Sequence, residues 1–460
     1  MKQTKSNYLR FICFLLFGMI GILQADTPSD LHSAIEAGEV ELVKTLIKNG
    51  TDLESKDSEG ATPLIAIVKK LPDTSIVMLL LKHGAEIDDK DKDGYTALHH
   101  AIFYKNQNIA NLLIREGAEI NANSKQDYTP LMAACETGQL TLVKLLVGMN
   151  ATIDEKDKDW NTPMRLASKN GHLDIIRFLV DSGADMTTYT QGWCSLYEAS
   201  RFGHIEIVKF FISQGIGLKL EFKSGWRPLL AACYEGHNDI AMLLIENGAY
   251  VHQQTKTNYT TLMAAASKGL IDIAHILIEK GVSINQQTKE GWTALIYSCN
   301  NGHGDVAKLL LENGADIEKK TDNKYTALMG AANSGLTDMA RLLIKKGAKV
   351  NQQTKEGWTA LIYGSYYGHG DVVQLLIDMG ADIEKKTDNK YTALMGACKS
   401  GLTNVARTFI EKGANVNAKT KEKWWSPLII ACFNGAPVEL VELLLEKKTK
   451  KAITPTFYTV

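Results

Sequence analysis

One motif recurs along almost the whole of this 460-residue chain, and its spacing limits what the chain can fold into. It is clearest in two near-copies that begin at Asn285 and Asn351, and each copy contains one variant reading GWTALIY and another reading KYTALMG. The leucine of this motif, or the residue equivalent to it, occurs at Leu31, Leu64, Leu98, Leu131, Met164, Leu196, Leu229, Leu262, Leu295, Leu328, Leu361, Leu394 and Leu428. Most steps are 33 residues and the others are 32 or 34, so the chain is an array of about 13 similar units.

Each unit predicts two helices followed by an extended loop. A Thr, often followed by Pro as in residues 61–64, opens the first helix, because Thr accepts hydrogen bonds from free amides and Pro needs none there. Small residues, a turn and an apolar spacing of three and four, as in residues 174–180, predict the second helix. A left-handed Gly closes it, or Asn150 where the glycine comes early. One extra residue and Pro72 predict a local loop distortion within residues 68–75.

The period of 33 and the Thr-Pro-Leu-like start resemble the ankyrin-repeat family from about Asp30 to Glu446. The resemblance implies an all-α ankyrin-repeat solenoid, in which helix-turn-helix units of 33 residues are joined by β-hairpin loops in a curved, single elongated domain. One unit cannot bury its apolar faces alone, so stacking must supply the core. Within the array at 26–446, we expect end caps at about 30–50 and 428–446, followed by a basic C-terminal tail at 447–460.

The first 25 residues differ from the array. Lys2, Lys5 and Arg10 precede an apolar run at 11–23, and the small residue Ala25 follows at a point where cleavage is expected. This pattern predicts a secretory signal peptide at 1–25 and an exported protein, periplasmic or secreted. The apolar run is shorter than the ~20 residues that a membrane-spanning helix needs, and an uncleaved N-terminal membrane anchor is the alternative. We expect no membrane span in the mature chain.

The charge of the chain is balanced. Lys and Arg number 51 and Asp and Glu number 52, which gives a formal net charge of -1 and no general attraction to a polyanion. Lysines at the hairpin tips alternate with acidic residues, as Lys355 does with Glu356, and are expected to form a solvated rim. We therefore expect no nucleic acid partner, and we expect a monomer.

Five of the seven cysteines share one position, four residues after the repeated leucine: Cys135, Cys233, Cys299, Cys398 and Cys432. Other units have Ala or Ser there, so we interpret Cys as one choice of a small buried residue. Neighbouring helices lie roughly 10 Å apart, whereas the Cα atoms of a disulfide lie within about 7 Å. We therefore predict free thiols.

Motifs that carry catalysis or bind metal ions are missing from the sequence. It contains no H-E-x-x-H, G-x-S-x-G, P-loop or dinucleotide-binding motif. Histidines recur once per unit between the helices, at His172, His204, His237, His303 and His369. They are too far apart to share a metal ion, and the family resemblance implies a structural role. We expect no enzyme activity, no catalytic residue, no metal and no cofactor.

An aromatic residue stands three positions before the repeated leucine in ten of twelve hairpins. These residues are Tyr95, Tyr128, Trp193, Trp226, Tyr259, Trp292, Tyr325, Trp358, Tyr391 and Trp425. In ankyrin-like proteins this position faces the concave groove and varies with the partner, so the resemblance implies a ladder of rings at roughly 10 Å spacing. Tyr and Trp give a large contact area at low entropic cost, which suits recognition. The rings could instead only stack between neighbouring hairpins, and the sequence leaves both interpretations open.

A second strip lies at the variable end of the first helix, which in this family lines the same groove. Its aromatic members are Phe202, Tyr234, Tyr366, Tyr367 and Phe433. Tyr366 and Tyr367 replace Asn300 and Asn301 of the otherwise matching copy. The two copies therefore diverge in the chemistry of the groove.

These observations predict a non-enzymatic scaffold that binds an unidentified protein or peptide on its concave hairpin and first-helix face. One alternative is a module that binds a glycan or another repetitive polymer, because regularly spaced rings can stack on sugar faces. A further alternative is a secreted effector that acts inside a host cell.

Overall fold

The computed structural model describes residues 30–187, 194–216, 218, 225–422 and 424–452. The expected signal peptide at 1–25, Trp193 of the predicted ladder and residues 453–460 of the expected tail lie outside these ranges. The chain divides into two compact units, Met1–Ala199 and Ser200–Val460, and each is described by itself. Within the described ranges, 26 helices form 13 pairs, which confirms the predicted all-α array. None of these helices is long and apolar enough to cross a membrane.

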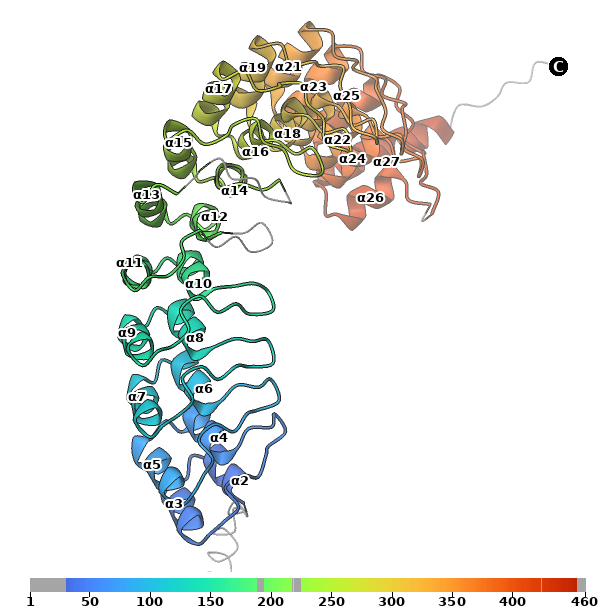
Figure 1. Cartoon of the computed structure of the whole chain (residues 1–460). Helices are drawn as coiled ribbons and strands as arrows, with labels where there is room; N and C mark the ends of the chain where they lie inside the picture. Colours follow the sequence, from blue (N-terminus) through green and yellow to red (C-terminus); the bar gives the residue numbers. More distant parts are fainter. Residues whose placement is uncertain (1–29, 188–193, 217, 219–224, 423, 453–460) are drawn as a thin grey trace, which may run out of the picture. The chain divides into compact units, whose positions relative to one another are not determined.

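The helices of the first unit lie in two rows (Figure 1). First helices pack on first helices, and second helices pack on second helices. The pairs are α2 (Leu31–Glu36) with α3 (Val40–Lys48), α4 (Pro63–Lys70) with α5 (Thr74–Lys82), α6 (Ala97–Phe103) with α7 (Gln107–Arg115), α8 (Pro130–Thr137) with α9 (Leu140–Gly148), and α10 (Pro163–Asn170) with α11 (Leu173–Asp181). The boundary between the units falls within α12 (Ser195–Arg201).

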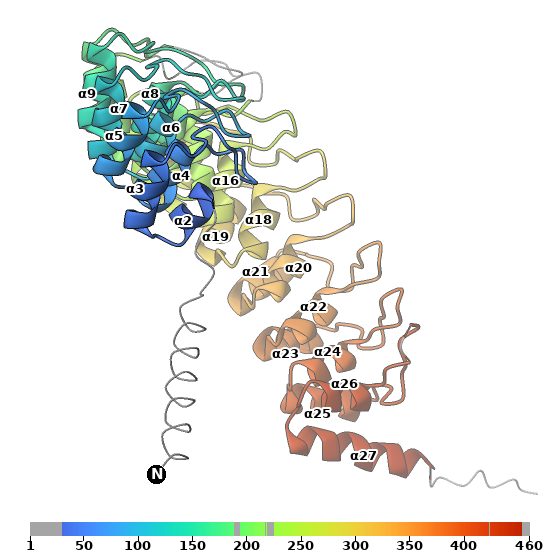
Figure 2. The same cartoon turned by 90° about the horizontal axis from the view of Figure 1, so that it is seen from below.

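The second unit repeats the same arrangement, with its hairpin loops along one side of the first helices (Figure 2). Its helices are α13 (Ile205–Ser213), α14 (Pro228–Glu235), α15 (Asn238–Glu246), α16 (Thr261–Lys268), α17 (Ile271–Glu279), α18 (Ala294–Asn300), α19 (Gly304–Glu312), α20 (Ala327–Asn333), α21 (Thr337–Lys345), α22 (Ala360–Tyr367), α23 (Gly370–Asp378), α24 (Ala393–Lys399), α25 (Thr403–Glu411), α26 (Pro427–Phe433) and α27 (Val438–Ala452). The last helix runs past Glu446, where the sequence places the end of the array.

The repeated Thr caps the first helices as predicted. The Thr359 side chain, for example, accepts a hydrogen bond from the Ile362 amide at 3.2 Å. Cys194 stands at this cap position in its own unit, and its sulfur accepts from the Tyr197 amide at 3.4 Å. Burial raises the pKa of the Cys194 thiol to about 11, because a thiolate is poorly solvated there. The cap position therefore also accommodates a weak acceptor such as sulfur.

The shared cysteine position is buried in four of its five members, and the described cysteines are all free thiols. Burial raises the pKa of the Cys299 and Cys398 thiols to about 12, so both stay protonated at neutral pH. Cys432 is exposed, so the prediction of a small buried residue is wrong at this position. It lies on α26, which belongs to the last helix pair of the described chain. No following repeat in that part of the chain packs against it.

Histidines between the helices connect neighbouring repeats. In four repeats the histidine Nε2 atom lies 2.9–3.2 Å from a backbone oxygen at the end of the first helix of the preceding repeat. For His303 that oxygen belongs to Ser267. The ring also lies against a left-handed glycine of the preceding repeat, since a Cβ atom added to Gly269 would come 2.5 Å from His303 Nδ1. These contacts give the histidines the structural role that the sequence predicts.

The hairpins hold the residues before each first helix in a fixed register. In one hairpin the Thr321 amide donates to the Tyr325 oxygen at 3.0 Å, and neighbouring hairpins are linked because the Asp322 amide donates to the Glu290 oxygen at 2.9 Å. Among the described residues, their pairing amounts to three isolated bridges, such as Lys320 with Thr326, rather than continuous strands. Short turns linked from repeat to repeat thus set the spacing of the predicted ladder.

A buried histidine also links two hairpins of the first unit. The Thr96 amide donates to His99 Nδ1 at 3.2 Å, so this nitrogen is an acceptor and Nε2 carries the proton. Nε2 donates to the Tyr128 backbone oxygen at 3.0 Å. Burial lowers the pKa of His99 to about 4, because it disfavours the charged ring. Protonation would place a second donor against the Thr96 amide.

Glycine substitutions test the contact between repeats. Gly269→Ala and Gly302→Ala both place Ala in the left-handed region, with φ of 72° and 84°, and share a cost of about 1–2 kcal/mol. Only the Cβ atom added by Gly269→Ala would clash with a histidine ring, because the atom nearest to a Cβ at Gly302 is Ser334 Cβ at 3.9 Å. We expect Gly269→Ala to destabilise its repeats by about 1 kcal/mol more, measured by hydrogen exchange of the adjoining helices. Equal losses would contradict this account.

Acid should destabilise the first unit through His99. The pKa of His99 in the folded state, about 4, lies below the unfolded value of about 6.5. The stability that neutral His99 contributes to the folded state is therefore fully present above pH 6.5 and is lost as the pH falls toward 4. The expected loss is about 3 kcal/mol. His99→Met introduces a residue found at the equivalent position in other repeats, such as Met132, and should flatten this dependence. Unfolding by urea at pH 7 and pH 4.5 measures it, and an unchanged slope in His99→Met would contradict the assignment.

Candidate functional site

The predicted ladder residues lie at the hairpin ends, but they are more enclosed than an open ladder would be. Nine of the ten are in the described part of the chain, and none of these nine is fully exposed. Tyr128 and Tyr325 are only 8% exposed. Most of these rings therefore offer part of their surface, while the rest packs within the protein.

In the first unit, rings from two hairpins and one helix end form a cluster. Tyr95 and Tyr128, which belong to successive hairpins, have ring centroids 6.3 Å apart, well below the roughly 10 Å expected from helix spacing. Phe103, at the end of α6, fills the space between them at 5.3 Å from Tyr95 and 5.9 Å from Tyr128. The Tyr128 hydroxyl donates to the Glu136 carboxylate. The rings lean toward each other, which shortens the spacing.

In the second unit the ring contacts continue across six hairpins, and we call these residues the aromatic row. Its members are Trp226, Tyr234, Tyr259, Trp292, Tyr297, Tyr325, Trp358, Tyr363, Tyr366 and Tyr391. Successive members have ring centroids 4.9–6.1 Å apart. This geometry is compatible with both interpretations of the ladder, because each ring packs on a neighbour and leaves another part of its surface open.

Two members of the row, Tyr297 and Tyr363, were not predicted from the sequence as part of this surface. Each stacks on the tryptophan of its own hairpin at a centroid distance of 4.9 Å and also contacts the tyrosine of a neighbouring hairpin. They stand two residues after the repeated leucine in the GWTALIY variant. The signal was therefore present, because the tyrosine occurs only in repeats whose hairpin carries this Gly-Trp pair.

The predicted strip at the first-helix ends is the more exposed part of this surface. The exposed fractions are 41% for Phe202, 44% for Tyr234, 53% for Tyr367 and 72% for Phe433, while Tyr366 is half-buried. Tyr234 and Tyr366 join the aromatic row directly, and Tyr367 contacts Tyr366 at 5.1 Å. Phe433 packs on Trp425 at 4.8 Å. The strip and the ladder of the second unit thus meet along the hairpin side of the first helices.

Four tyrosines of the row are neutral at physiological pH: Tyr297, Tyr325, Tyr363 and Tyr391. Burial raises the pKa of Tyr297 and Tyr363 to about 12, and it raises those of Tyr325 and Tyr391 further. The Tyr325 hydroxyl donates to Asn300 Oδ1 at 2.8 Å. In the second copy Tyr366 replaces this asparagine, and the buried Tyr391 hydroxyl has no hydrogen-bond partner among the residues that the structure describes. One substitution between the copies thus removes an acceptor and adds a ring.

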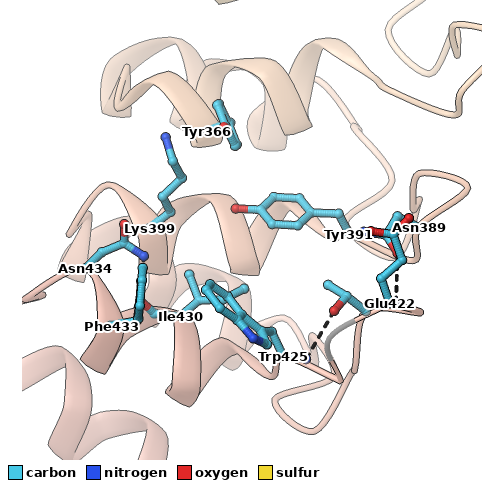
Figure 3. Close-up of a pocket in the computed structure, with 10 residues that line it drawn as sticks. Tyr366, Asn389, Tyr391, Lys399, Glu422, Trp425, Ile430, Phe433 and Asn434 are labelled. Atoms are coloured by element: carbon cyan, nitrogen blue, oxygen red, sulfur yellow. Dashed lines mark hydrogen bonds between the residues drawn. The ribbon is translucent and has the colours of Figure 1, made fainter.

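A pocket of about 300 Å³ lies at the C-terminal end of this surface (Figure 3). Its walls come from the ends of α22, α24 and α26 and from two hairpins, and they include Tyr366, Tyr391, Lys399, Trp425 and Phe433. Asn389 fixes the hairpin side, because its side-chain oxygen accepts from the Lys421 amide at 3.1 Å. The pocket is therefore bounded by rings from three successive repeats.

Cations lie over the rings of this surface. Lys399 Nζ is 3.6 Å from the centroid of Tyr366, and Lys268 Nζ is 5.7 Å from that of Tyr234, both within the range of a cation–π interaction. No carboxylate in the described part of the chain forms an ion pair with Lys399. Its ammonium group instead contacts the ring of Tyr366.

The described residues contain no group of three or more His, Cys, Asp or Glu side chains placed to hold a metal ion. His100 and Asp91 form a largely buried titratable pair, with Nε2 and Oδ2 2.7 Å apart. Asp91 also accepts from the Tyr95 amide at 2.9 Å, so this pair fixes a hairpin turn. Its chemistry is structural.

Comparison with known proteins gives one family. The family described as Ankyrin repeats (3 copies) matches residues 31–124, 116–190, 187–255, 250–321, 317–387 and 379–454. An ankyrin repeat protein of Fowlpox virus (strain NVSL) is 38% identical over 64 residues, which is 14% of this chain and 45% of the viral protein. The chain thus spans under half the length of that relative. The crystal structure of the human ASB11 ankyrin repeat domain is similar with a TM-score of 0.42 and 24% identity, over 48% of this chain and 98% of that one.

The two copies of KYTALMG provide a matched test of the orphaned hydroxyl. Tyr325→Phe removes a hydrogen bond to Asn300 and should destabilise its repeat by about 1 kcal/mol. Tyr391→Phe removes a buried hydroxyl that has no partner and should leave stability unchanged or raise it by about 1 kcal/mol. Hydrogen exchange of α20 and α24 measures the two effects locally, and an equal loss in both variants would contradict the assignment.

Proposed function

The chain belongs to the ankyrin-repeat family, and we propose that it is a non-enzymatic scaffold that binds a protein or peptide partner along the hairpin ends and first helices. Arrays of this family are typically binding modules rather than enzymes. Each repeat contacts only its neighbours, so the array presents a long surface that changes chemistry from unit to unit. Binding to such a surface requires anchors that are held in place before the partner arrives.

The observation that carries this proposal is the aromatic row of the second unit. Each ring is held by one or more neighbouring rings at 4.9–6.1 Å, so little side-chain entropy remains to be lost when a partner binds. Tyr and Trp are also the residues most enriched among binding hot spots. The exposed rings Tyr234 and Tyr367 extend the same surface.

Ring packing favours a protein partner over a glycan. A sugar binds best to a flat, open aromatic face. Trp358 instead has near-parallel rings beside it at both Tyr363 and Tyr391, with interplanar angles of 29° and 26°, and Trp292 has Tyr297 at 26°. Stacking covers these ring faces, whereas a protein partner can also contact ring edges.

Two tryptophans of the row test the proposal. Partners are captured by crosslinking the array in the cells that express it, and the Kd of the captured partner is then measured with purified chains. The double variant Trp292→Ala with Trp358→Ala should weaken binding at least about tenfold, because it removes two central anchors. Replacing both with Tyr, the residue found at Tyr259, should keep most of the affinity.

Trp160→Ala is the matched control. Trp160 is 44% exposed, lies in the first unit and is outside the aromatic row, so its removal should leave the Kd unchanged. Circular dichroism establishes that every variant keeps its helical content. If the Ala double variant retains every captured partner with unchanged Kd, the aromatic row does not bind the partner.

A further inference from the structure

We propose that the pocket between α22, α24 and α26 binds an acidic side chain of a partner peptide together with the apolar residue next to it. This inference rests on the proposed function and specifies the chemistry at one end of its surface. Three observations carry it: a cation and a buried hydroxyl that have no ion pair and no acceptor within the described chain, and an exposed phenylalanine beside a cavity of about 300 Å³.

Lys399 supplies the charge that an acidic side chain needs. Its ammonium group lies over the Tyr366 ring at 3.6 Å and pairs with no carboxylate of the described chain. A hydrogen bond between an ammonium and a carboxylate is stronger than a cation–π contact at a partly exposed site. A partner carboxylate can therefore draw the ammonium away from the ring.

The Tyr391 hydroxyl supplies a second donor. Figure 3 shows it directed toward the side of the pocket where Lys399 and Tyr366 lie, and it is buried with no hydrogen-bond partner in the described ranges. In the matching copy, Tyr325 donates to Asn300, so this position takes an oxygen acceptor wherever one is present. Lys399 and Tyr391 both line the pocket, so a carboxylate held by Lys399 lies on the side toward which this hydroxyl is directed.

Rings provide the apolar part of the site. Phe433 is 72% exposed and packs on Trp425 at 4.8 Å, above the buried side chain of Ile430. Large exposed apolar groups beside a cavity mark a place where a partner buries its own apolar side chain. An aromatic or aliphatic residue next to the acidic one fits this arrangement.

Charge also orients the ligand. Glu422 lines the hairpin end of the pocket, whereas Lys399 lies at the helix end (Figure 3). A carboxylate near Glu422 would be repelled, and a cationic ligand near Lys399 would be repelled as well. The acidic group therefore enters at the helix end, with its apolar neighbour against Trp425 and Phe433.

Capped peptides test the pocket directly. Two pools of hexapeptides carry Phe, Tyr, Leu or Trp at position three and differ only in Glu or Gln at position four. Each peptide is acetylated, amidated and labelled with a neutral dye, and its binding to the array is followed by fluorescence polarisation. We expect the Glu pool to bind about tenfold more tightly than the Gln pool.

Substitutions of lysine identify the site. Lys399→Asn, which introduces the residue present at Asn333 of the matching copy, should abolish the preference for Glu, and Lys399→Arg should keep it. Lys169→Asn removes a lysine from the equivalent repeat position in the first unit and should leave the preference unchanged. A third pool, with Gln at position four and a free C-terminal carboxylate, should bind as weakly as the Gln pool.

Three results would overturn the inference: equal binding of the Glu and Gln pools, a preference that survives Lys399→Asn, or tight binding of the third pool, which would assign the site to a chain terminus. The absence of binding by either pool would overturn it too. None of these results affects the capture of a partner through Trp292 and Trp358. Failure of the pocket and failure of the proposed function are therefore distinguishable.

Discussion

The packing of each first helix against the next is the interaction on which the rest of the structure depends. A single helix pair leaves its apolar faces open, and stacking covers them. The close approach requires small residues: a Cβ added to Gly330 would come 2.8 Å from the Asn300 amide nitrogen, and one added to Gly396 would come 2.9 Å from that of Tyr366. This approach places the helix end of one repeat beside the hairpin ring of the next. The surface assigned to binding is thus a consequence of how the core is packed.

Most of the fold could be predicted from the sequence, because local residue patterns within each repeat determine its helices and turns. The Thr caps, the left-handed Asn150 and the histidines between helices follow from residue chemistry and a constant period. The repeat period does not predict how side chains of different repeats contact one another. The ring contacts through Tyr297, the missing acceptor of Tyr391 and the exposure of Cys432 depend on residues of other repeats, or on the absence of a further repeat at the end of the described helices.

The duplicated copies show how such an array can gain specificity at little structural cost. Both copies keep the hairpin residues and most of the helix residues, and their differences include the helix ends that border the groove. The change from Asn300 to Tyr366 leaves the packing of the first helices intact, yet it converts a satisfied hydrogen bond into an orphaned hydroxyl beside a ring and a cation. Unsatisfied polar groups are costly in a core, and at a binding surface a partner can satisfy them. Local chemistry can thus change while the scaffold stays the same.

The central claim is that partners bind on the hairpin and first-helix side rather than on the second helices. Hydroxyl-radical footprinting of the array, alone and with its captured partner, tests this most directly because both sides carry exposed, reactive side chains. The account predicts protection of Tyr234 and Tyr367, and unchanged reactivity of Ile271 and Met379 on the second-helix side. Protection of Ile271 and Met379 with Tyr234 and Tyr367 still reactive would contradict it.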